Sequence, residues 1–374
     1  MRVSRYHRVK GHAEIAGGGF AGLAAAAALG HRGWTVRVHE RSSELRAFGA
    51  GIFVWENGLR VLDALGVVNP VLAGSWQAPR YEVRDHLNHL VAEKSFGVEL
   101  GTRMITMTRQ CLYAALLGAA TRNGAVFETN STAVSATSEG ELILADGTRR
   151  QADLVVAADG VNSEVRESLN LTKIRYGAGD FGAIRLLVRR AKGESDNVIH
   201  YLSPPENPTR RMLYVPCDND NLYVAFTVGK ADMAAKTIPI ERDLWSATWP
   251  HLADLFARVG NEGRWDIYET VSLKRWSQRR VAVIGDAAHG MAPTLGQGAG
   301  CAMMNALALA GALAAADDLE AGLMAWEAKA RPITDHTQDI SHRYMAAAHT
   351  GEGGGTLWDE EALKTARSIP FGCA

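Results

Sequence analysis

The chain has 374 residues, of which 47% are hydrophobic and 22% are charged, a composition that excludes an intrinsically disordered protein. Lys and Arg total 40 against 41 Asp and Glu, so the net charge of −1 gives no support to nucleic acid or an anionic membrane as a partner. We therefore expect a small-molecule partner, and the length favours two domains over one.

The four cysteines lie far apart without a CxxC pair, and the twelve histidines form no HExxH motif. This pattern predicts free thiols and no metal site. Basic residues near the N-terminus are not followed by the apolar segment of a signal peptide, and the apolar runs 20–30 and 302–316 are too short to cross a bilayer. We expect a cytoplasmic protein without a membrane partner.

A strand at 13–16, a helix at 20–30 and a strand at 34–39 are predicted at the start of the chain. Between the first two lies a GxGxxG sequence, in which Gly17 permits a tight turn, Gly19 lets the backbone approach a pyrophosphate and Gly22 lets helix and strand pack. Glu40 follows the second strand, where a carboxylate can accept ribose hydroxyls. The cofactor contacts expected from this nucleotide-binding unit are Gly17, Gly19, Phe20, Ala21, Gly22, Glu40, Arg41 and Gly51.

The middle of the chain has strand-like runs at 181–188, 198–202, 211–215 and 222–228, separated by turn-rich segments, which predict an antiparallel sheet. A helix at 241–259 and a strand at 281–284 follow. We predict an α/β protein with a Rossmann-like nucleotide-binding domain split between residues 11–175 and 276–350, and a substrate domain inserted at 176–275. The glycine-rich start of residues 351–374 predicts a flexible tail.

Two later motifs point to FAD. Residues 152–160 (ADLVVAADG) with Arg166 resemble the Asp-Gly motif of FAD-dependent aromatic hydroxylases with the para-hydroxybenzoate hydroxylase fold, and residues 283–300 (VIGDAAHGMAPTLGQGAG) resemble their Gly-Asp motif. The resemblance implies non-covalent FAD, reduced by transiently bound NAD(P)H because no second GxGxxG is present. Reaction with O2 would then give a flavin C4a-hydroperoxide that hydroxylates an aromatic ring.

The resemblance also implies cofactor contacts. Asp286 would accept a ribityl hydroxyl, and Arg109, at the start of a helix at 110–121, would contact the phosphates and the ribityl chain. The amides of Gly298, Ala299 and Gly300, which open a helix at 301–316, would face the charge of the reduced flavin.

Two sites, at Asp159 with Arg166 and at His289, have two readings each, whereas Pro293 has one. Asp159 would either contact FAD or, with Arg166, organise loops. His289 would pack within its motif or act as a base. Pro293 is expected to place its carbonyl beside the flavin and the substrate, because proline has a fixed φ and no N–H.

Residues 42–52, 211–217, 297–303 and 331–335 resemble the 2-methyl-3-hydroxypyridine-5-carboxylate oxygenase family of pyridoxine degradation, which opens a pyridine ring. This implies a small aromatic carboxylate as substrate, with Tyr223, Arg211 and Pro293 as catalytic residues. Arg211, supported by the neighbouring Tyr214 and Tyr223, would anchor the carboxylate, with Arg185 as its rival. Phe53 replaces the tyrosine of that family. The implied substrate contacts are Phe53, Tyr81, Arg185, Arg211, Tyr223 and Tyr268.

Two alternatives to ring opening stay open: a hydroxybenzoate or phenol hydroxylase, and a flavin-binding sensor without turnover. The sequence leaves open the preference for NADH or NADPH and whether the protein is a homo-oligomer.

Overall fold

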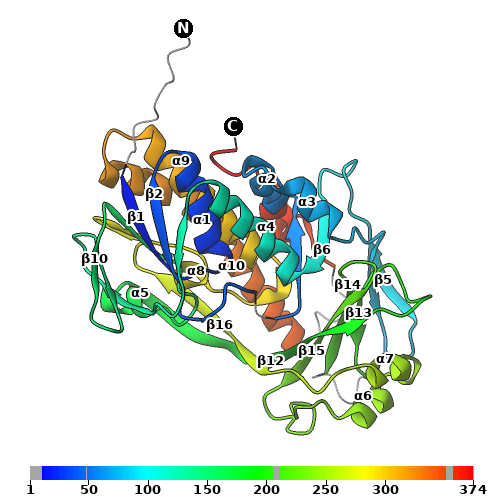
Figure 1. The fold of residues 1–374 in the computed structure, drawn as a ribbon. Coiled ribbons are helices and arrows are strands. Elements are labelled where there is room, and N and C mark those ends of the chain that lie inside the picture. The colour runs from blue at the N-terminus through cyan, green and yellow to red at the C-terminus, as the bar shows by residue number, and fades with distance from the viewer. Residues whose placement is uncertain (1–10, 48, 205–209, 351–356, 374) are drawn as a thin grey trace.

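The computed structural model describes residues 11–47, 49–204, 210–350 and 357–373. Its two main parts lie side by side (Figure 1). The first is built on a six-stranded sheet of order β17-β18-β11-β1-β2-β7, parallel except at β17. Its strands are β1 (His12–Ala16), β2 (Thr35–His39), β7 (Val126–Glu128), β11 (Leu154–Ala157), β17 (Ser277–Gln278) and β18 (Val281–Val283).

Long helices complete this part: α1 (Phe20–His31), α4 (Arg109–Arg122), α9 (Gly298–Ala315) and α10 (Leu319–Thr350). The predicted strand–helix–strand start is confirmed. The alanine-rich α1 packs between α4 and α9, and α9 packs on α10. Helix α9 is longer than the apolar run that predicted it and would be long enough to cross a membrane, but 72% of it is buried inside the protein. It is therefore a core helix.

Shorter elements complete the fold. They are β3 (Gly51–Trp55) paired with β6 (Met104–Thr108), a three-stranded sheet of β8 (Ala133–Ala136), β9 (Glu141–Leu144) and β10 (Arg149–Gln151), and the helices α2 (Glu56–Ala64), α3 (Val68–Ala73), α5 (Glu164–Ser168), α8 (Asp286–His289) and η2 (Pro293–Leu295).

The second part is a seven-stranded sheet of order β16-β12-β15-β14-β13-β4-β5, antiparallel except between β13 and β4. Its strands are β4 (Tyr81–Arg84), β5 (Leu90–Lys94), β12 (Thr172–Arg189), β13 (Val198–Leu202), β14 (Arg211–Pro216), β15 (Asn221–Gly229) and β16 (Trp265–Leu273). All four predicted runs are strands. The sheet also draws β4 and β5 from residues before the predicted inserted segment.

Side chains alternate between the two faces of this sheet. One face, with Leu186, Met212, Val224 and Phe226 among its residues, forms a buried core with the helices α6 (Arg242–Thr248) and α7 (Ala253–Ala257). The predicted continuous helix at 241–259 is wrong, because the chain breaks at Pro250 into the short η1 (Pro250–Leu252). The other face is turned toward the first part.

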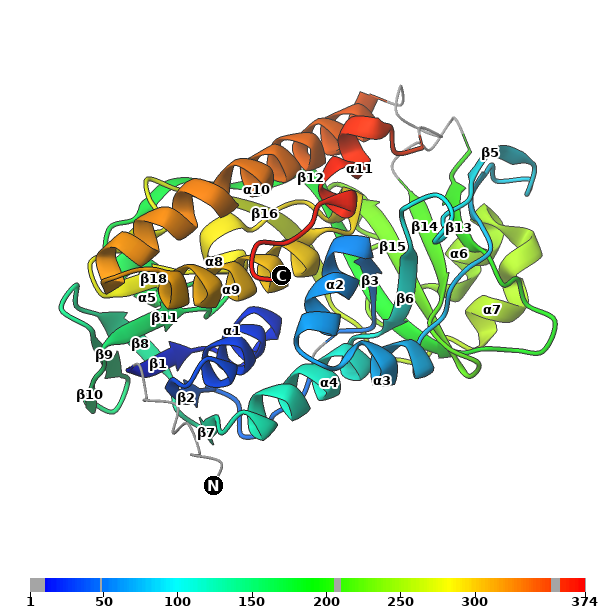
Figure 2. The same ribbon diagram turned by 90° about the horizontal axis from the view of Figure 1, so that it is seen from above.

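The prediction of a flexible tail is wrong for residues 357–373. This segment contains the helix α11 (Glu360–Arg367), whose Asp359 side chain caps the N–H of Ala362 at 2.9 Å and whose Leu363 is buried. Figure 2 shows α11 between α10 and α2. The glycine-rich residues 351–356 lie outside the described residues.

Candidate active site

A cavity of about 970 Å³ lies between the parallel sheet and the seven-stranded sheet, with residues of both parts in its wall. It brings together most of the predicted site residues: Gly19, Phe20, Ala21, Gly51, Phe53, Tyr81, Arg109, Arg185, Arg211, Tyr223, Tyr268, Asp286, Pro293, Gly298 and Ala299. The predicted residues outside its lining are Gly17, Gly22, Glu40, Arg41, Asp159 and Gly300.

The three glycines of the GxGxxG turn have different surroundings. Gly17 has φ +99°, and a Cβ there would lie 2.4 Å from the carbonyl oxygen of Ala158. A Cβ on Gly22 would lie 2.0 Å from the carbonyl oxygen of Gly17. A Cβ on Gly19 would meet nothing within 4 Å. Packing therefore requires Gly17 and Gly22, whereas Gly19 borders open space where a pyrophosphate can approach the start of α1.

Glu40 directly follows β2, as a ribose-binding carboxylate requires. Its two carboxylate oxygens accept the backbone N–H groups of Gly18 at 3.0 Å and Ser42 at 2.9 Å. These bonds fix the carboxylate beside the glycine turn and leave it further lone pairs for ribose hydroxyls. Arg41 is exposed.

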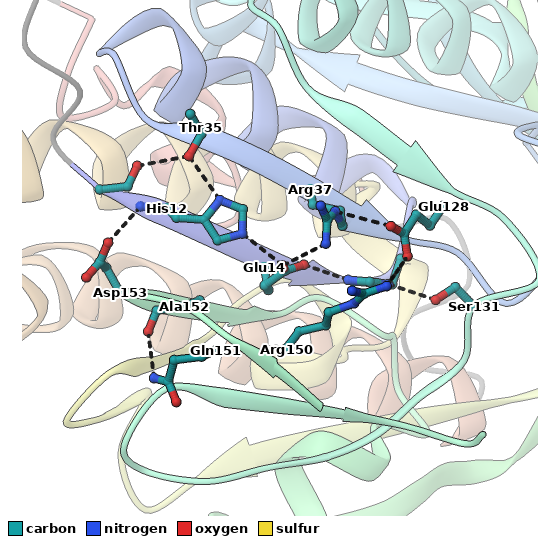
Figure 3. A network of polar contacts seen from close by, with 12 residues as sticks. His12, Glu14, Thr35, Arg37, Glu128, Ser131, Arg150, Gln151, Ala152 and Asp153 are labelled. Atoms are coloured by element: carbon teal, nitrogen blue, oxygen red, sulfur yellow. Dashed lines mark hydrogen bonds and ion pairs between the residues drawn. The ribbon is translucent and has the colours of Figure 1, made fainter. Parts of the chain in front are cut away.

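Behind this turn, β1 and β2 carry a buried polar network (Figure 3). Glu14 accepts hydrogen bonds from His39 at 2.6 Å and from His12 at 2.8 Å, and His39 also bonds Ser131 Oγ at 2.7 Å. The carbonyl of His39 accepts the N–H of Gly17 at 2.8 Å. The network thereby ties the strands to the turn that Glu40 borders.

We predict that Glu14→Gln lowers the melting temperature most near neutral pH. Burial raises the pKa of Glu14, but its bonds to His39 and His12 outweigh this, so the pKa lies below its ordinary 4.5. The carboxylate therefore stabilises the fold above that pH and loses this contribution as pH falls. We expect a loss of roughly 1–3 kcal/mol near neutral pH, since the bonds are charged and buried. Thermal unfolding across pH measures it, with Glu327→Gln, whose ion pair with Arg331 at 2.7 Å lies outside this network, as control. A difference in melting temperature between variant and wild type that stays constant as the pH falls below 4.5 would contradict the prediction.

Arg109 and Asp286 both line the cavity and are close enough for their charges to interact. Thr108 caps α4 by accepting the N–H of Cys111, which sets Arg109 at the first position of the helix with its guanidinium 4.7 Å from the centre of the Phe20 ring. Arg109 Nε is buried without a hydrogen-bond partner among the described residues. An anionic or hydroxyl-rich ligand would satisfy this donor, as the FAD phosphates and ribityl chain do in the expected arrangement.

Asp286 opens α8 after β18 and the two residues Ile284 and Gly285 that follow the strand. Its side chain lines the cavity and keeps accessible surface. Burial raises the pKa of this carboxyl, while Arg109 and Arg185 act in the opposite direction. A hydroxyl donor arriving in the cavity would find an acceptor there.

Asp286→Ala is expected to weaken FAD retention about 10- to 150-fold, which corresponds to the roughly 1.5–3 kcal/mol of a charged hydrogen bond. Fluorescence titration of the apoprotein with FAD measures this, and Asp286→Asn, which keeps an acceptor oxygen, should lose less. An FAD affinity equal to that of the wild type would show that Asp286 does not contact the cofactor.

The first turn of α9 offers unpaired N–H groups. The first backbone bond of the helix runs from Cys301 to the carbonyl of Gln297 at 2.9 Å, so the N–H groups of Gly298, Ala299 and Gly300 precede it. Gly298 and Ala299 line the cavity, and a Cβ on Gly298 would meet nothing within 4 Å. Gly300 instead packs on Asn57. The positive end of α9 therefore points into the cavity, where it can stabilise a reduced flavin.

Arg166 is fully buried and donates to the carbonyls of Val161 at 3.1 Å and Ala287 at 3.0 Å. It thus joins the Asp-Gly motif to the Gly-Asp motif, and Asp159 accepts the N–H of Val165. Arg166 therefore organises loops, whereas the other carboxylate oxygen of Asp159 is buried without a hydrogen-bond partner among the described residues, so both readings of Asp159 stay open. His289 bonds Asn305 at 2.9 Å outside the cavity, and burial lowers its pKa to about 4, which favours its packing role.

The cavity face of the seven-stranded sheet holds the predicted substrate residues. Arg185 and Tyr223 face the flavin end, where Arg185 pairs with Asp266 at 3.4 Å and Gly51 makes room for the Tyr223 side chain, 2.5 Å from where a Cβ would lie. Arg211 lies further along, close to Tyr81. Pro293 lines the cavity, and its carbonyl accepts the N–H of Gly296 at 2.9 Å.

Tyr214 does not support Arg211 as expected. It points to the opposite face of the sheet, where it is buried against α6 and α7 and its hydroxyl donates to the carbonyl of Ser195 at 3.2 Å. The period of two along β14 could have shown this, since Arg211 and Tyr214 differ by an odd number of positions.

The sequence reading missed His200 and the C-terminal residues Leu357 and Trp358, all in the cavity wall. His200 lies between Val83 and Leu213 in the sheet, on the face that carries Tyr81 and Arg211. Burial and the charge of Arg211 lower the pKa of His200 to about 3, so its imidazole is neutral at working pH. The alternation of side chains along β13 could have predicted this position. Tyr201 faces the core formed with α6 and α7, so the adjacent His200 must face the cavity.

A family model described as an FAD binding domain matches residues 12–341. The chain belongs to this family, and it is an FAD-dependent aromatic monooxygenase. It is 39% identical over 377 residues to a putative 2-heptyl-3-hydroxy-4(1H)-quinolone synthase of Rhodococcus erythropolis, covering 97% of this chain and 98% of the relative. A 2-heptyl-3-hydroxy-4(1H)-quinolone synthase of Mycobacteroides abscessus is 39% identical over 89% of both chains.

Among solved structures, the tetrameric form of 2-methyl-3-hydroxypyridine-5-carboxylic acid oxygenase superposes with a TM-score of 0.90 at 43% identity, covering 96% of both chains. The predicted resemblance to this family is confirmed, as are the FAD cofactor and the two-part fold. The sensor alternative is disfavoured, because the relatives are monooxygenases.

Proposed function

We propose that the protein uses NAD(P)H and O2 to hydroxylate and open the ring of a hydroxypyridine carboxylate. The proposal rests on the position of Arg211, whose guanidinium lies in the cavity wall. It is supported by the 43% identity of the chain to an oxygenase named for such a substrate. A planar guanidinium can bind a carboxylate through two parallel hydrogen bonds, which fixes the ring as well as holding it.

The chain's residues would act mainly by positioning and by excluding water. FAD, when bound, supplies the activated oxygen. Arg211 would hold the carboxylate, and the Tyr223 hydroxyl would bond the ring hydroxyl; burial raises the pKa of Tyr223, so this phenol keeps its proton. The Pro293 carbonyl and the first turn of α9 border the flavin end. Binding and orientation of this kind suffice for a ring activated by its own hydroxyl.

A second candidate substrate is a 4-quinolone, which would be hydroxylated without ring opening. The relatives that are 39% identical are named as 2-heptyl-3-hydroxy-4(1H)-quinolone synthases. The apolar side chains of Phe53, Leu213 and Leu357 in the cavity wall would suit such a ring. A carbonyl oxygen could replace the carboxylate as the partner of Arg211.

One screen separates these functions. The purified protein, with its FAD content measured first, is tested with hydroxypyridine carboxylates, hydroxybenzoates and 2-alkyl-4-quinolones for acceleration of NADH and NADPH oxidation. The product masses then distinguish simple hydroxylation, which adds one oxygen atom, from ring opening, which adds an oxygen atom and the elements of water. An FAD-loaded protein stimulated only by quinolones would refute the pyridine proposal.

A further inference from the structure

The C-terminal segment 357–373 is anchored to several parts of the fold. The carbonyl of Trp358 accepts a hydrogen bond from Lys94 Nζ at 2.7 Å on β5, and its ring Nε1 donates to the carbonyl of Thr294 at 2.9 Å. At the far end of α11, Arg367 Nε donates to Thr102 Oγ1 at 2.6 Å. These bonds hold the segment from both ends.

Trp358 occupies the point where the two parts of the active site meet. Thr294, its partner, follows Pro293 at the flavin end, whereas the Trp358 ring contacts Tyr81 of the seven-stranded sheet with 4.6 Å between ring centres. Trp55 supports the ring edge-on at 5.1 Å. Trp358 is only 9% exposed and lines the cavity. It therefore bridges the flavin-side loop and the sheet that carries the proposed carboxylate anchor.

We infer that Trp358 is a specificity-determining residue that closes the substrate end of the cavity and limits the length of the substituent that a ring substrate can carry. The inference rests on the proposed function, in that the occupant is a substituted planar ring. Leu357 and Tyr344 border the same end of the cavity, so shortening Trp358 would open an apolar space rather than a polar one. An alkyl chain is the substituent that gains from such a space.

The test compares wild type with Trp358→Leu and Trp358→Phe on a series of rings that differ only in alkyl length, from methyl to heptyl, using the ring class that the wild type oxidises. We expect the ratio of kcat/KM for heptyl over methyl to rise about 10-fold or more in Trp358→Leu, because a few methylene groups in an apolar pocket are worth this much. The same ratio in Trp358→Phe should lie between the values of the wild type and Trp358→Leu. FAD content should stay equal to that of the wild type in both.

Arg367→Ala is the matched control, since it loosens the same segment at a residue outside the cavity lining. An unchanged length dependence in Trp358→Leu, or an equal change in Arg367→Ala, would overturn the inference. If no ring is oxidised by the wild type, the proposed function fails separately. Binding of the 2-alkyl-4-quinolones from methyl to heptyl is then scored by changes in the flavin absorbance. Tighter binding of the heptyl ring in Trp358→Leu supports the inference, and an order of affinities equal to that of the wild type overturns it.

Discussion

A Gly19→Leu protein is expected to fold and to contain no FAD. A side chain at Gly19 would meet no protein atom within 4 Å, and the residue has φ −79°, which any L-amino acid adopts. The fold should therefore accept leucine. The side chain would fill the space at the start of α1 in which the pyrophosphate is expected, and the protein should purify colourless.

Absorbance of the purified protein and thermal unfolding measure the two halves of this prediction. Gly22→Ala is the contrasting variant, because its Cβ would lie 2.0 Å from the backbone oxygen of Gly17, so it should lose stability first. A Gly19→Leu protein that stays yellow would show that the pyrophosphate does not pass this turn. Loss of folding in Gly19→Leu would show that the open space is needed by the chain itself.

The flavin half of the site was predictable because its determinants are local in the sequence. A glycine turn, a following helix and a carboxylate at the end of the next strand specify a nucleotide site within 30 residues or so. The Gly-Asp motif likewise carries Asp286 and the N-terminus of α9 on one short stretch. In each case the backbone geometry that the chemistry needs is encoded by neighbouring residues.

The substrate half was less predictable because distant segments build it. Strand β4, which supplies Tyr81, pairs with β13 more than 100 residues later. Trp358 reaches the cavity only because α11 packs between α10 and α2, and a glycine run before it resembles the start of a disordered tail. Tertiary packing, which short-range patterns do not encode, decides these positions.

Arg211→Met is expected to retain FAD, to raise the substrate KM about 10-fold or more and to divert NAD(P)H oxidation toward hydrogen peroxide. The loss harms geometry as well as binding, because a ring held only by apolar contacts no longer keeps its reacting carbon in place. Oxygen uptake, peroxide release and product yield, measured together, give the degree of uncoupling.

Two companion variants decide whether Arg211 is the anchor. Arg211→Lys should recover only part of the coupling, since an ammonium is a point charge without the planar fork. Arg185 already pairs with Asp266, and its charge opposes the rise that burial causes in the pKa of the Asp286 carboxyl, so Arg185→Met should weaken FAD binding more than it raises the substrate KM. If Arg185→Met instead raises KM and uncouples the reaction while Arg211→Met behaves as wild type, the carboxylate is bound two strands away, on β12.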